Sequence, residues 1–382
     1  MSMELSTDRA TGSGASETTL PAAGGGVALK ARVAWLGLAN FAWAAPSLAL
    51  ALGFVAMVSL VAGVHGLAIR WPGSALLGEA QKILLVAYAP LVAAYAADTL
   101  LGPRARAGFL RTLLFSPRFL VDLLLAIVVV EATLLTFVHL EQLVPALNSI
   151  LWDSPLWRID AWLHLGIEPA ARLSDAAGEH GWLRSFDRAY GLAGPVQLAL
   201  PLLFLISRRL RPDRGRFFFA FCVLWMLGGL VVVLGPSLGP CYYRPSRFVW
   251  LDGAPDARHL QATLLQDYVR FRGDPLSGGS ELARGIAGFP SMQVGALAFF
   301  ALATWRRFRA LSAGLWALTA VVFVSSLALA WHYAIGGYVG VLLAALAWWI
   351  AGRVVPPDED PAAGAQAAAA TPASPARGGA AR

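Results

Sequence analysis

Several apolar runs, each about twenty residues long, dominate this chain of 382 residues. A helix of that length crosses the hydrocarbon core of a bilayer, which is about 30 Å thick. Across the chain 57% of the residues are hydrophobic and only 14% are charged, whereas a soluble domain carries about 25% charged residues. These features predict an all-α polytopic membrane protein.

The apolar runs predict about eight transmembrane helices. They lie near residues 44–66, 82–101, 119–139, 189–207, 216–234, 291–305, 312–331 and 333–351. A Ser/Thr/Gly/Ala-rich leader (1–28) precedes them, and a Pro/Ala/Gly-rich tail (352–382) follows them. Both end segments are predicted to be disordered and cytoplasmic, because their composition cannot form an apolar core.

Arginines predict the orientation of the helices. They cluster in alternate short connections: Arg104, Arg106, Arg111 and Arg118; Arg208, Arg209, Arg211, Arg214 and Arg216; Arg306, Arg307 and Arg309. Short basic connections stay in the cytoplasm, so both termini are predicted inside and the long loops 140–188 and 235–290 outside. The net charge of +7 then serves orientation and contact with anionic lipid, and we predict no nucleic-acid partner.

Three segments with chemically informative residues fall on the predicted outer face. The first is LGPSLGPCYYRPSRF (234–248), the second is GFPSMQVG (288–295) and the third is SSLALAWHYAIGGYVG (325–340). The string GPSLG within the first segment matches the G-x-S-x-G pattern of α/β-hydrolases. We reject that interpretation, because the motif requires a preceding strand and here it follows a transmembrane helix.

The order and placement of these segments resemble the type 2 phosphatidic acid phosphatase superfamily, and within it the inositol phosphorylceramide synthase-like (inositolphosphotransferase) branch. The matching residues are Gly239-Pro240 and Arg244-Pro245 in the first segment, Pro290, Ser291, Met292 and Val294 in the second, and His332, Tyr333 and Gly340 in the third. The resemblance covers a six-helix core at about residues 119–351, with two extra transmembrane helices in residues 29–118 before it.

The resemblance implies a site for a lipid phosphate or phospholipid headgroup. His332 corresponds to the family's nucleophile, which forms a phosphohistidine, and Ser291, Gln293 and Arg244 would bind the phosphate. Elementary chemistry agrees with these roles. A neutral imidazole is a good nucleophile, a helix N-terminus offers N–H groups to an anion, and arginine forks onto phosphate oxygens. We predict no cofactor and no metal.

Four positions depart from the family pattern. Gln293 replaces the histidine that protonates the leaving group, and Gly336 replaces the aspartate that orients the nucleophile. Ser237 and Ser326 replace a lysine and an arginine, which are often missing in the synthase-like branch. A positioned general acid is worth about 10²–10⁴-fold in rate, so these motifs predict weakened catalysis. Two hypotheses remain open: a slow phosphotransferase or phosphatase, and a pseudoenzyme that binds a lipid headgroup or membrane partner.

Other polar residues leave alternatives open. Glu131 lies inside a predicted transmembrane helix and is either functional or a hydrogen-bonded bundle residue. Asp160 and His164 form a helix-surface pair or, less favoured, a metal pair. His259, Asp267, Asp274 and Glu281 either replace the missing general acid or are solvated surface residues. The resemblance and the Ala/Arg/Gly-rich composition favour the inner membrane of a bacterium.

Overall fold

The computed structural model describes residues 41–67, 116–207, 209–275 and 285–356. The described residues from Trp43 onward belong to one compact unit. The predicted transmembrane helix at 82–101, Glu281, the predicted leader and residues 357–382 of the predicted tail lie outside the described residues. The predicted start of the tail at 352 was early, because helix α15 continues to Val354. All regular elements in the described residues are helical, which confirms the predicted all-α class.

Six helical segments of the described residues are long and apolar enough to cross a membrane. They are α2 (Ala45–Val64), α5 (Pro117–Leu147), α8 (Leu183–Gly191) continued by α9 (Ala193–Ile206), the 3-10 turn η2 (Arg211–Asp213) continued by α10 (Arg214–Leu234), α14 (Arg309–Ala328) and α15 (Ala334–Val354). A seventh apolar helix, α13 (Met292–Trp305), is shorter. The chain is therefore an integral membrane protein.

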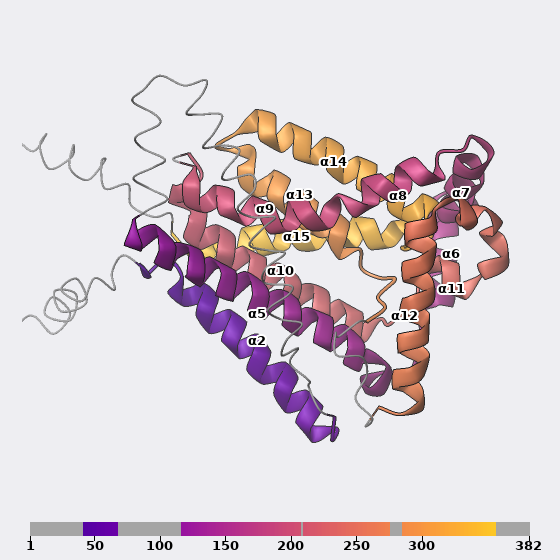
Figure 1. The fold of residues 1–382 in the computed structure, drawn as a ribbon, viewed down its shortest axis with the longest axis horizontal. Coiled ribbons are helices and arrows are strands. Elements are labelled where there is room, and N and C mark those ends of the chain that lie inside the picture. Colours follow the sequence, from indigo (N-terminus) through magenta and orange to yellow (C-terminus); the bar gives the residue numbers. More distant parts are fainter. Residues whose placement is uncertain (1–40, 68–115, 208, 276–284, 357–382) are drawn as a thin grey trace, which may run out of the picture. The chain divides into compact units, whose positions relative to one another are not determined.

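Helix α13 lies in the core of this bundle. It packs against α14 and α15, while α10 packs against α15 and α5, and α2 packs against α5 and α10 (Figure 1). Stacked rings join α10 to α13, with the Phe217 ring centroid 5.2 Å from that of Phe299 and 5.8 Å from that of Phe300. Aromatic pairs of this kind add to the apolar burial that holds the helices together.

Three helix boundaries differ from the prediction. Helix α5 continues to Leu147, past the polar residues at 139–142 that interrupt the apolar run. The predicted helix at 189–207 is built from α8 and α9, which meet at Leu192. Residues 329–333 separate α14 from α15, where the prediction left almost no connection. Helix ends follow hydrogen bonding and packing, and hydropathy alone does not resolve them.

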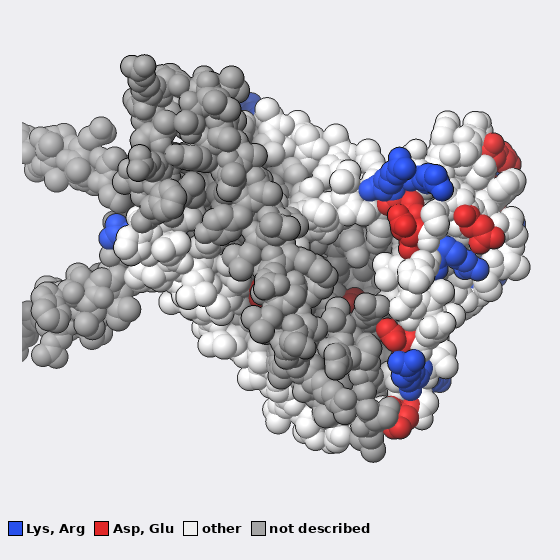
Figure 2. All heavy atoms as spheres, viewed as in Figure 1, with Lys and Arg blue, Asp and Glu red and all other residues white. Residues whose placement is uncertain are grey.

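The two long loops fold into short helices, which we call the loop cap. It consists of α6 (Asp153–Leu163), α7 (Pro169–Glu179), α11 (Pro240–Tyr243), the 3-10 turns η3 (Pro245–Arg247) and η4 (Val249–Gly253), and α12 (Pro255–Gly273). Figure 2 shows charged side chains of both signs gathered at the end of the molecule where α7 and α12 lie, while most of the described helix surface in this view is white. The loop cap is thus the polar end of an apolar bundle.

Candidate functional site

The three segments singled out in the sequence meet between the loop cap and the ends of α13 and α15. Backbone hydrogen bonds join them in pairs: Gly288 N–H donates to the Ser237 carbonyl (2.8 Å), Cys241 N–H to the Ala330 carbonyl (3.1 Å) and Ser291 N–H to the Gly336 carbonyl (3.0 Å). Each segment is therefore bonded to the other two. The structure brings His332, Ser291, Gly336 and Ser237 into one site.

Two glycines permit this close approach. Gly239 has φ +108°, a conformation that disfavours L side chains, and a Cβ there would lie 2.5 Å from the Trp331 carbonyl oxygen. A Cβ at Gly340 would lie 2.5 Å from the carbonyl oxygen of Ser291. Real atoms do not approach that closely, so a side chain at either position would push two of the segments apart.

His332 occupies the connection between α14 and α15 and is only 5% exposed. Its Nδ1 atom lies 3.1 Å from the Gly288 carbonyl oxygen. A carbonyl can only accept, so Nδ1 carries the proton and Nε2 keeps the lone pair. Burial lowers the pKa of His332 from 6.5 to about 4, although the Gly288 carbonyl opposes this shift. At neutral pH the imidazole is therefore uncharged, with its lone pair on Nε2.

Tyr190 of α8 contacts the other side of the same imidazole. Its hydroxyl oxygen lies 3.2 Å from His332 Nε2, and the tautomer just derived makes Tyr190 the donor. The tyrosine ring stacks on the neighbouring Trp331, with centroids 6.1 Å apart and an interplanar angle of 13°. Nothing in the sequence pattern pointed to Tyr190, since it lies far from the three segments along the chain.

Asp153 at the start of α6 ties the first segment to the third. Its buried carboxylate accepts from the N–H groups of Leu238 (3.0 Å) and Gly239 (2.8 Å) and from the hydroxyl of Tyr333 (2.8 Å). Because Tyr333 adjoins His332, this carboxylate links the backbone at Leu238 and Gly239 to the residue that follows His332. Charge-assisted hydrogen bonds of this type are the strong ones.

Asp160, two turns further along α6, caps helix α15. Its carboxylate accepts from the N–H groups of Ala334 (2.6 Å) and Ile335 (2.8 Å), which lie at the positive end of the helix dipole. Burial raises the pKa of Asp160, and these two N–H groups oppose the shift. His164 uses its Nε2 for the hydroxyl of Tyr338, at 2.9 Å. His164 Nδ1 lies 2.7 Å from the backbone carbonyl oxygen of Asp160, while the Asp160 carboxylate bonds only to the α15 N–H groups among the described hydrogen bonds. No cluster suited to a metal occurs among the described residues.

A sequence signal for Asp153 and Asp160 did exist. The two aspartates are seven residues apart on a helix whose buried face also carries Leu156 and Trp157. Residues spaced by seven share a helix face, so two acids on an apolar face required buried hydrogen-bond donors. Only the fold shows that these donors belong to the site.

Ser291 and Gln293 stand at the start of α13. Ser291 is fully buried, its N–H is used by the Gly336 carbonyl, and its hydroxyl has no hydrogen-bond partner among the described residues. Gln293 is half-buried in the first turn of the helix. A first turn has N–H groups without intrahelical partners. A buried hydroxyl and these N–H groups can together receive an oxyanion.

Arg244, predicted to bind phosphate, makes its contacts in the loop cap. Its guanidinium lies 4.8 Å from the ring centroid of Trp157 and 3.6 Å from a carboxylate oxygen of Glu168, and its side chain is 45% exposed. Glu168 also accepts from Arg247, at 3.2 Å, and from Trp157 Nε1, at 2.8 Å. The structure therefore places Arg244 in an ion-pair cluster with Glu168, and its described contacts do not include the His332 imidazole.

Ser237 and Ser326, where the predicted pattern has basic residues, are buried in the fold, and so is Gly336. The Ser326 hydroxyl donates to the Phe323 carbonyl at 2.8 Å within α14, and Ser237 is buried beside Gly288. A Cβ at Gly336 would lie 3.5 Å from both the Gly288 carbonyl oxygen and the Ser291 nitrogen, which is ordinary contact. The missing aspartate position is therefore adjacent to the carbonyl that now holds His332.

The other candidate acids lie on α12 or directly after it. His259 is exposed and Asp267 is half-buried on this helix, and Asp274, the residue after its last one, is exposed. The first turn of α12 is held by Asp187 of α8, which accepts from the N–H groups of Asp256 (3.0 Å) and Ala257 (3.1 Å). These positions agree with the interpretation of His259 and Asp274 as surface residues.

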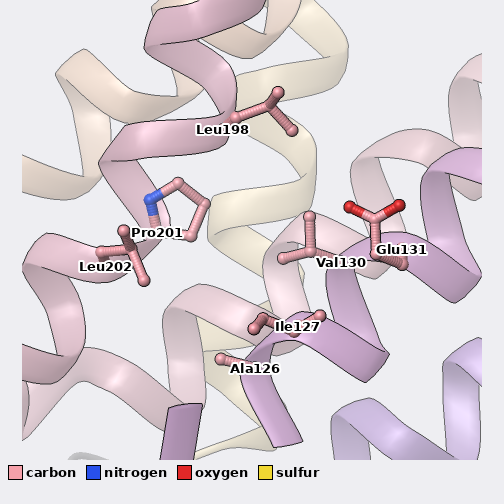
Figure 3. Close-up of a pocket in the computed structure, with 7 residues that line it drawn as sticks. All are labelled: Ala126, Ile127, Val130, Glu131, Leu198, Pro201 and Leu202. Atoms are coloured by element: carbon pink, nitrogen blue, oxygen red, sulfur yellow. The ribbon is translucent and has the colours of Figure 1, made fainter. Parts of the chain in front are cut away.

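Glu131 lines a small cavity between α5 and α9 (Figure 3). The cavity measures about 20 Å³, and its other walls are apolar: Ala126, Ile127, Val130, Leu198, Pro201 and Leu202. This volume holds about one water molecule. Pro201 supplies no N–H to its helix and stands across the cavity from α5. Glu131 lies on different elements from the His332 site.

The fold and the site define a helical membrane protein with a buried histidine where the three segments singled out in the sequence meet. A model of the PAP2 superfamily matches residues 154–350, which is more than half of the chain and includes all three segments. The protein therefore belongs to the PAP2 superfamily, named for type 2 phosphatidic acid phosphatase. Searches of curated proteins and of solved structures find no match.

Proposed function

We propose that the protein is a slow phosphotransferase or phosphatase on a lipid phosphate, of the inositol phosphorylceramide synthase-like branch. Its family implies lipid phosphate substrates in general. The arginines of the connections 208–216 and 306–309 support a site on the outer face, because short basic connections stay in the cytoplasm. The same rule places both termini inside, in what we propose is a bacterial inner membrane.

One observation carries the proposal: His332 is held in the tautomer that a phosphorus nucleophile needs. The Gly288 carbonyl fixes the proton on Nδ1 and leaves the lone pair on Nε2. The low pKa of His332 keeps that lone pair available at neutral pH. Ser291 and the first turn of α13 adjoin this site and supply donors for the phosphoryl oxygens.

Gln293 and Gly336 support slow rather than fast turnover. A glutamine amide donates a hydrogen bond to a phosphate oxygen but does not give up its proton near neutral pH. A carbonyl at Nδ1 orients the ring, yet it does not stabilise a developing positive charge as a carboxylate does. Loss of the general acid alone costs about 10²–10⁴-fold in rate.

A second candidate function is headgroup binding without turnover. The burial of His332 favours this function, because the side chain is only 5% exposed and its Nε2 atom already accepts a hydrogen bond from Tyr190. The ion pair of Arg244 with Glu168 also favours it, because that arginine is not free for phosphate.

The two candidates differ in whether phosphorus becomes bonded to His332. Full-length protein in mixed micelles is incubated with ³²P-labelled phosphatidic acid, beside the His332→Ala variant. The enzyme hypothesis predicts released or protein-bound label above that variant, with acid-labile, base-stable label on the chain. Equal background in both proteins, together with retained binding of the lipid, would establish the non-catalytic function.

A further inference from the structure

Tyr190, which lies outside the three segments, is hydrogen-bonded to His332 and must respond when that imidazole reacts. A lone pair on Nε2 that accepts from the Tyr190 hydroxyl at 3.2 Å cannot at the same time bond to phosphorus. Any attack by His332 therefore requires this hydroxyl to turn toward another acceptor. The question is which acceptor replaces Nε2.

Packing contacts hold the Tyr190 side chain in place. Its ring stacks on Trp331, the residue before His332, at an interplanar angle of 13°. One turn earlier on α8, the carboxylate of Asp187 accepts from two N–H groups at the start of α12. Stacking on Trp331 orients the ring, and the Asp187 bonds join its helix to α12, so rotation of the hydroxyl about the C–O bond is the simplest way for it to change acceptor.

A phosphoryl group on Nε2 would bring its own acceptors to the same place. In an in-line displacement the equatorial oxygens surround phosphorus, next to the attacking nitrogen. A hydroxyl already within hydrogen-bond distance of that nitrogen lies close to one of these oxygens once the N–P bond forms. Basic residues are absent at Ser237 and Ser326, and the Ser326 hydroxyl is bonded to its own helix.

We propose that Tyr190 is a substrate-binding residue, whose hydroxyl transfers its hydrogen bond from His332 Nε2 to an equatorial phosphoryl oxygen as the nucleophile attacks. This inference rests on the proposed function. The N–P bond forms from the Nε2 lone pair and the P–O bond to the leaving group breaks. The leaving oxygen keeps that electron pair and takes a proton from water, because Gln293 has none to give. Tyr190 keeps its own proton throughout.

Orthovanadate tests this role without requiring turnover, because it forms a five-coordinate adduct with a nucleophile. Binding is measured by titration calorimetry on the full-length protein in detergent micelles. We expect wild type to bind, His332→Ala to lose binding, and Tyr190→Phe to bind about tenfold more weakly or worse, since a hydrogen bond to a charged group is lost. Tyr268→Phe, on α12, where the hydroxyl accepts from Arg272 at 3.4 Å, makes the same chemical change and should bind as wild type does.

The alternatives give different results. If Tyr190 only blocks His332, then Tyr190→Phe will bind vanadate as tightly as wild type or more tightly, which overturns the inference and leaves the proposed function standing. If wild type binds no better than His332→Ala, both the inference and the proposed phosphoryl chemistry are overturned. A thermal melt of each variant separates loss of binding from loss of fold. If Tyr190→Phe itself fails to fold, Tyr190→His keeps a ring and a donor, and its failure to bind vanadate would overturn the assignment.

Discussion

The Nδ1 atom of His332 lies 3.1 Å from the backbone carbonyl oxygen of Gly288. This main-chain oxygen comes from another of the three segments. It accepts a hydrogen bond and so fixes the tautomer of the imidazole, as a carboxylate would. Unlike a carboxylate, it brings no negative charge to the ring. The imidazole is therefore oriented by this group without a counter-charge from it.

Restoring both missing groups should raise the rate of phosphoryl transfer. A Cβ at position 336 has ordinary contacts, so Gly336→Asp can be built beside the Gly288 carbonyl, and Gln293→His returns a general acid. We expect the double variant to release label from ³²P-phosphatidic acid about 10²-fold faster or more. The same double variant carrying His332→Ala is the control and should stay at background. A folded double variant without any gain would contradict the alignment of these two positions.

Alanine at Gly340 and alanine at Gly336 should differ in their effect on stability. At position 340 the new Cβ would stand 2.5 Å from the Ser291 carbonyl oxygen, whereas at position 336 the nearest atoms are 3.5 Å away. We expect Gly340→Ala to cost about 1–3 kcal/mol through overpacking and Gly336→Ala to cost much less. Thermal melts in micelles, followed by tryptophan fluorescence, compare the two. Equal melting temperatures would mean that α13 and α15 are less closely packed than described.

Removing the carboxylate of Asp153 should destabilise the site strongly. Asp153→Ala leaves two N–H groups and the Tyr333 hydroxyl without their acceptor, and each buried unpaired group costs about 1–3 kcal/mol. We therefore expect a loss of about 3 kcal/mol or more. Asp153→Asn keeps one acceptor oxygen and should lose less. Denaturant titration in micelles measures the free energy of unfolding of both variants. A loss below about 1 kcal/mol in the alanine variant would show that Asp153 does not hold the first and third segments together.

His332 should stay neutral well below the pH at which an ordinary histidine titrates. Its pKa is lowered to about 4 by burial. The chain has six histidines, so ¹³C NMR of labelled histidine, with His332→Ala for assignment, can follow this residue. We expect no change in its signal between pH 7 and 5.5. A midpoint above pH 6 would show that water reaches the ring.

The same pKa sets the sign of a stability change with pH. Between about pH 6.5 and about pH 4 the unfolded chain binds a proton at this histidine and the folded chain does not. Stability should therefore fall as the pH is lowered through this window. His332→Gln lacks the titrating group and should show a shallower dependence in the same melts.

Breaking the Arg244–Glu168 ion pair should change the affinity for a lipid headgroup modestly. Glu168→Gln keeps an acceptor for Trp157 Nε1 and removes the charge that holds Arg244 and Arg247. Since Arg244 is 45% exposed, we expect only a few-fold tighter binding of phosphatidic acid in micelles. Arg244→Gln added to Glu168→Gln should cancel the gain. An unchanged affinity in the Glu168 variant would exclude Arg244 from the headgroup site.

Much of the architecture was predictable because it depends on local composition. Apolar runs of membrane length predict transmembrane helices wherever they occur, and those at residues 216–234 and 312–331 correspond to α10 and α14. The motif strings around Ser291 and His332 predicted that two distant segments would meet, and they do. The extension of α5 to Leu147 was missed, because the apolar run that predicted this helix stops at its polar residues. The helix itself continues past them, since its hydrogen bonding and packing do not require an apolar sequence.

The partners of the site residues were decided only by the tertiary structure. The sequence alone predicted the all-helical membrane class, which the structure confirms, and the roles of His332, Gln293 and Gly336, which stay predictions. The carbonyl of Gly288 and the hydroxyl of Tyr190 have no sequence signature of their role, since any residue supplies a carbonyl and many supply a donor. The helical spacing of Asp153 and Asp160 indicated buried donors, but only the fold shows that the partners of Asp153 belong to the site. Hydrogen bonds depend on distance and direction in space, and those are set by how α6, α8 and α15 pack.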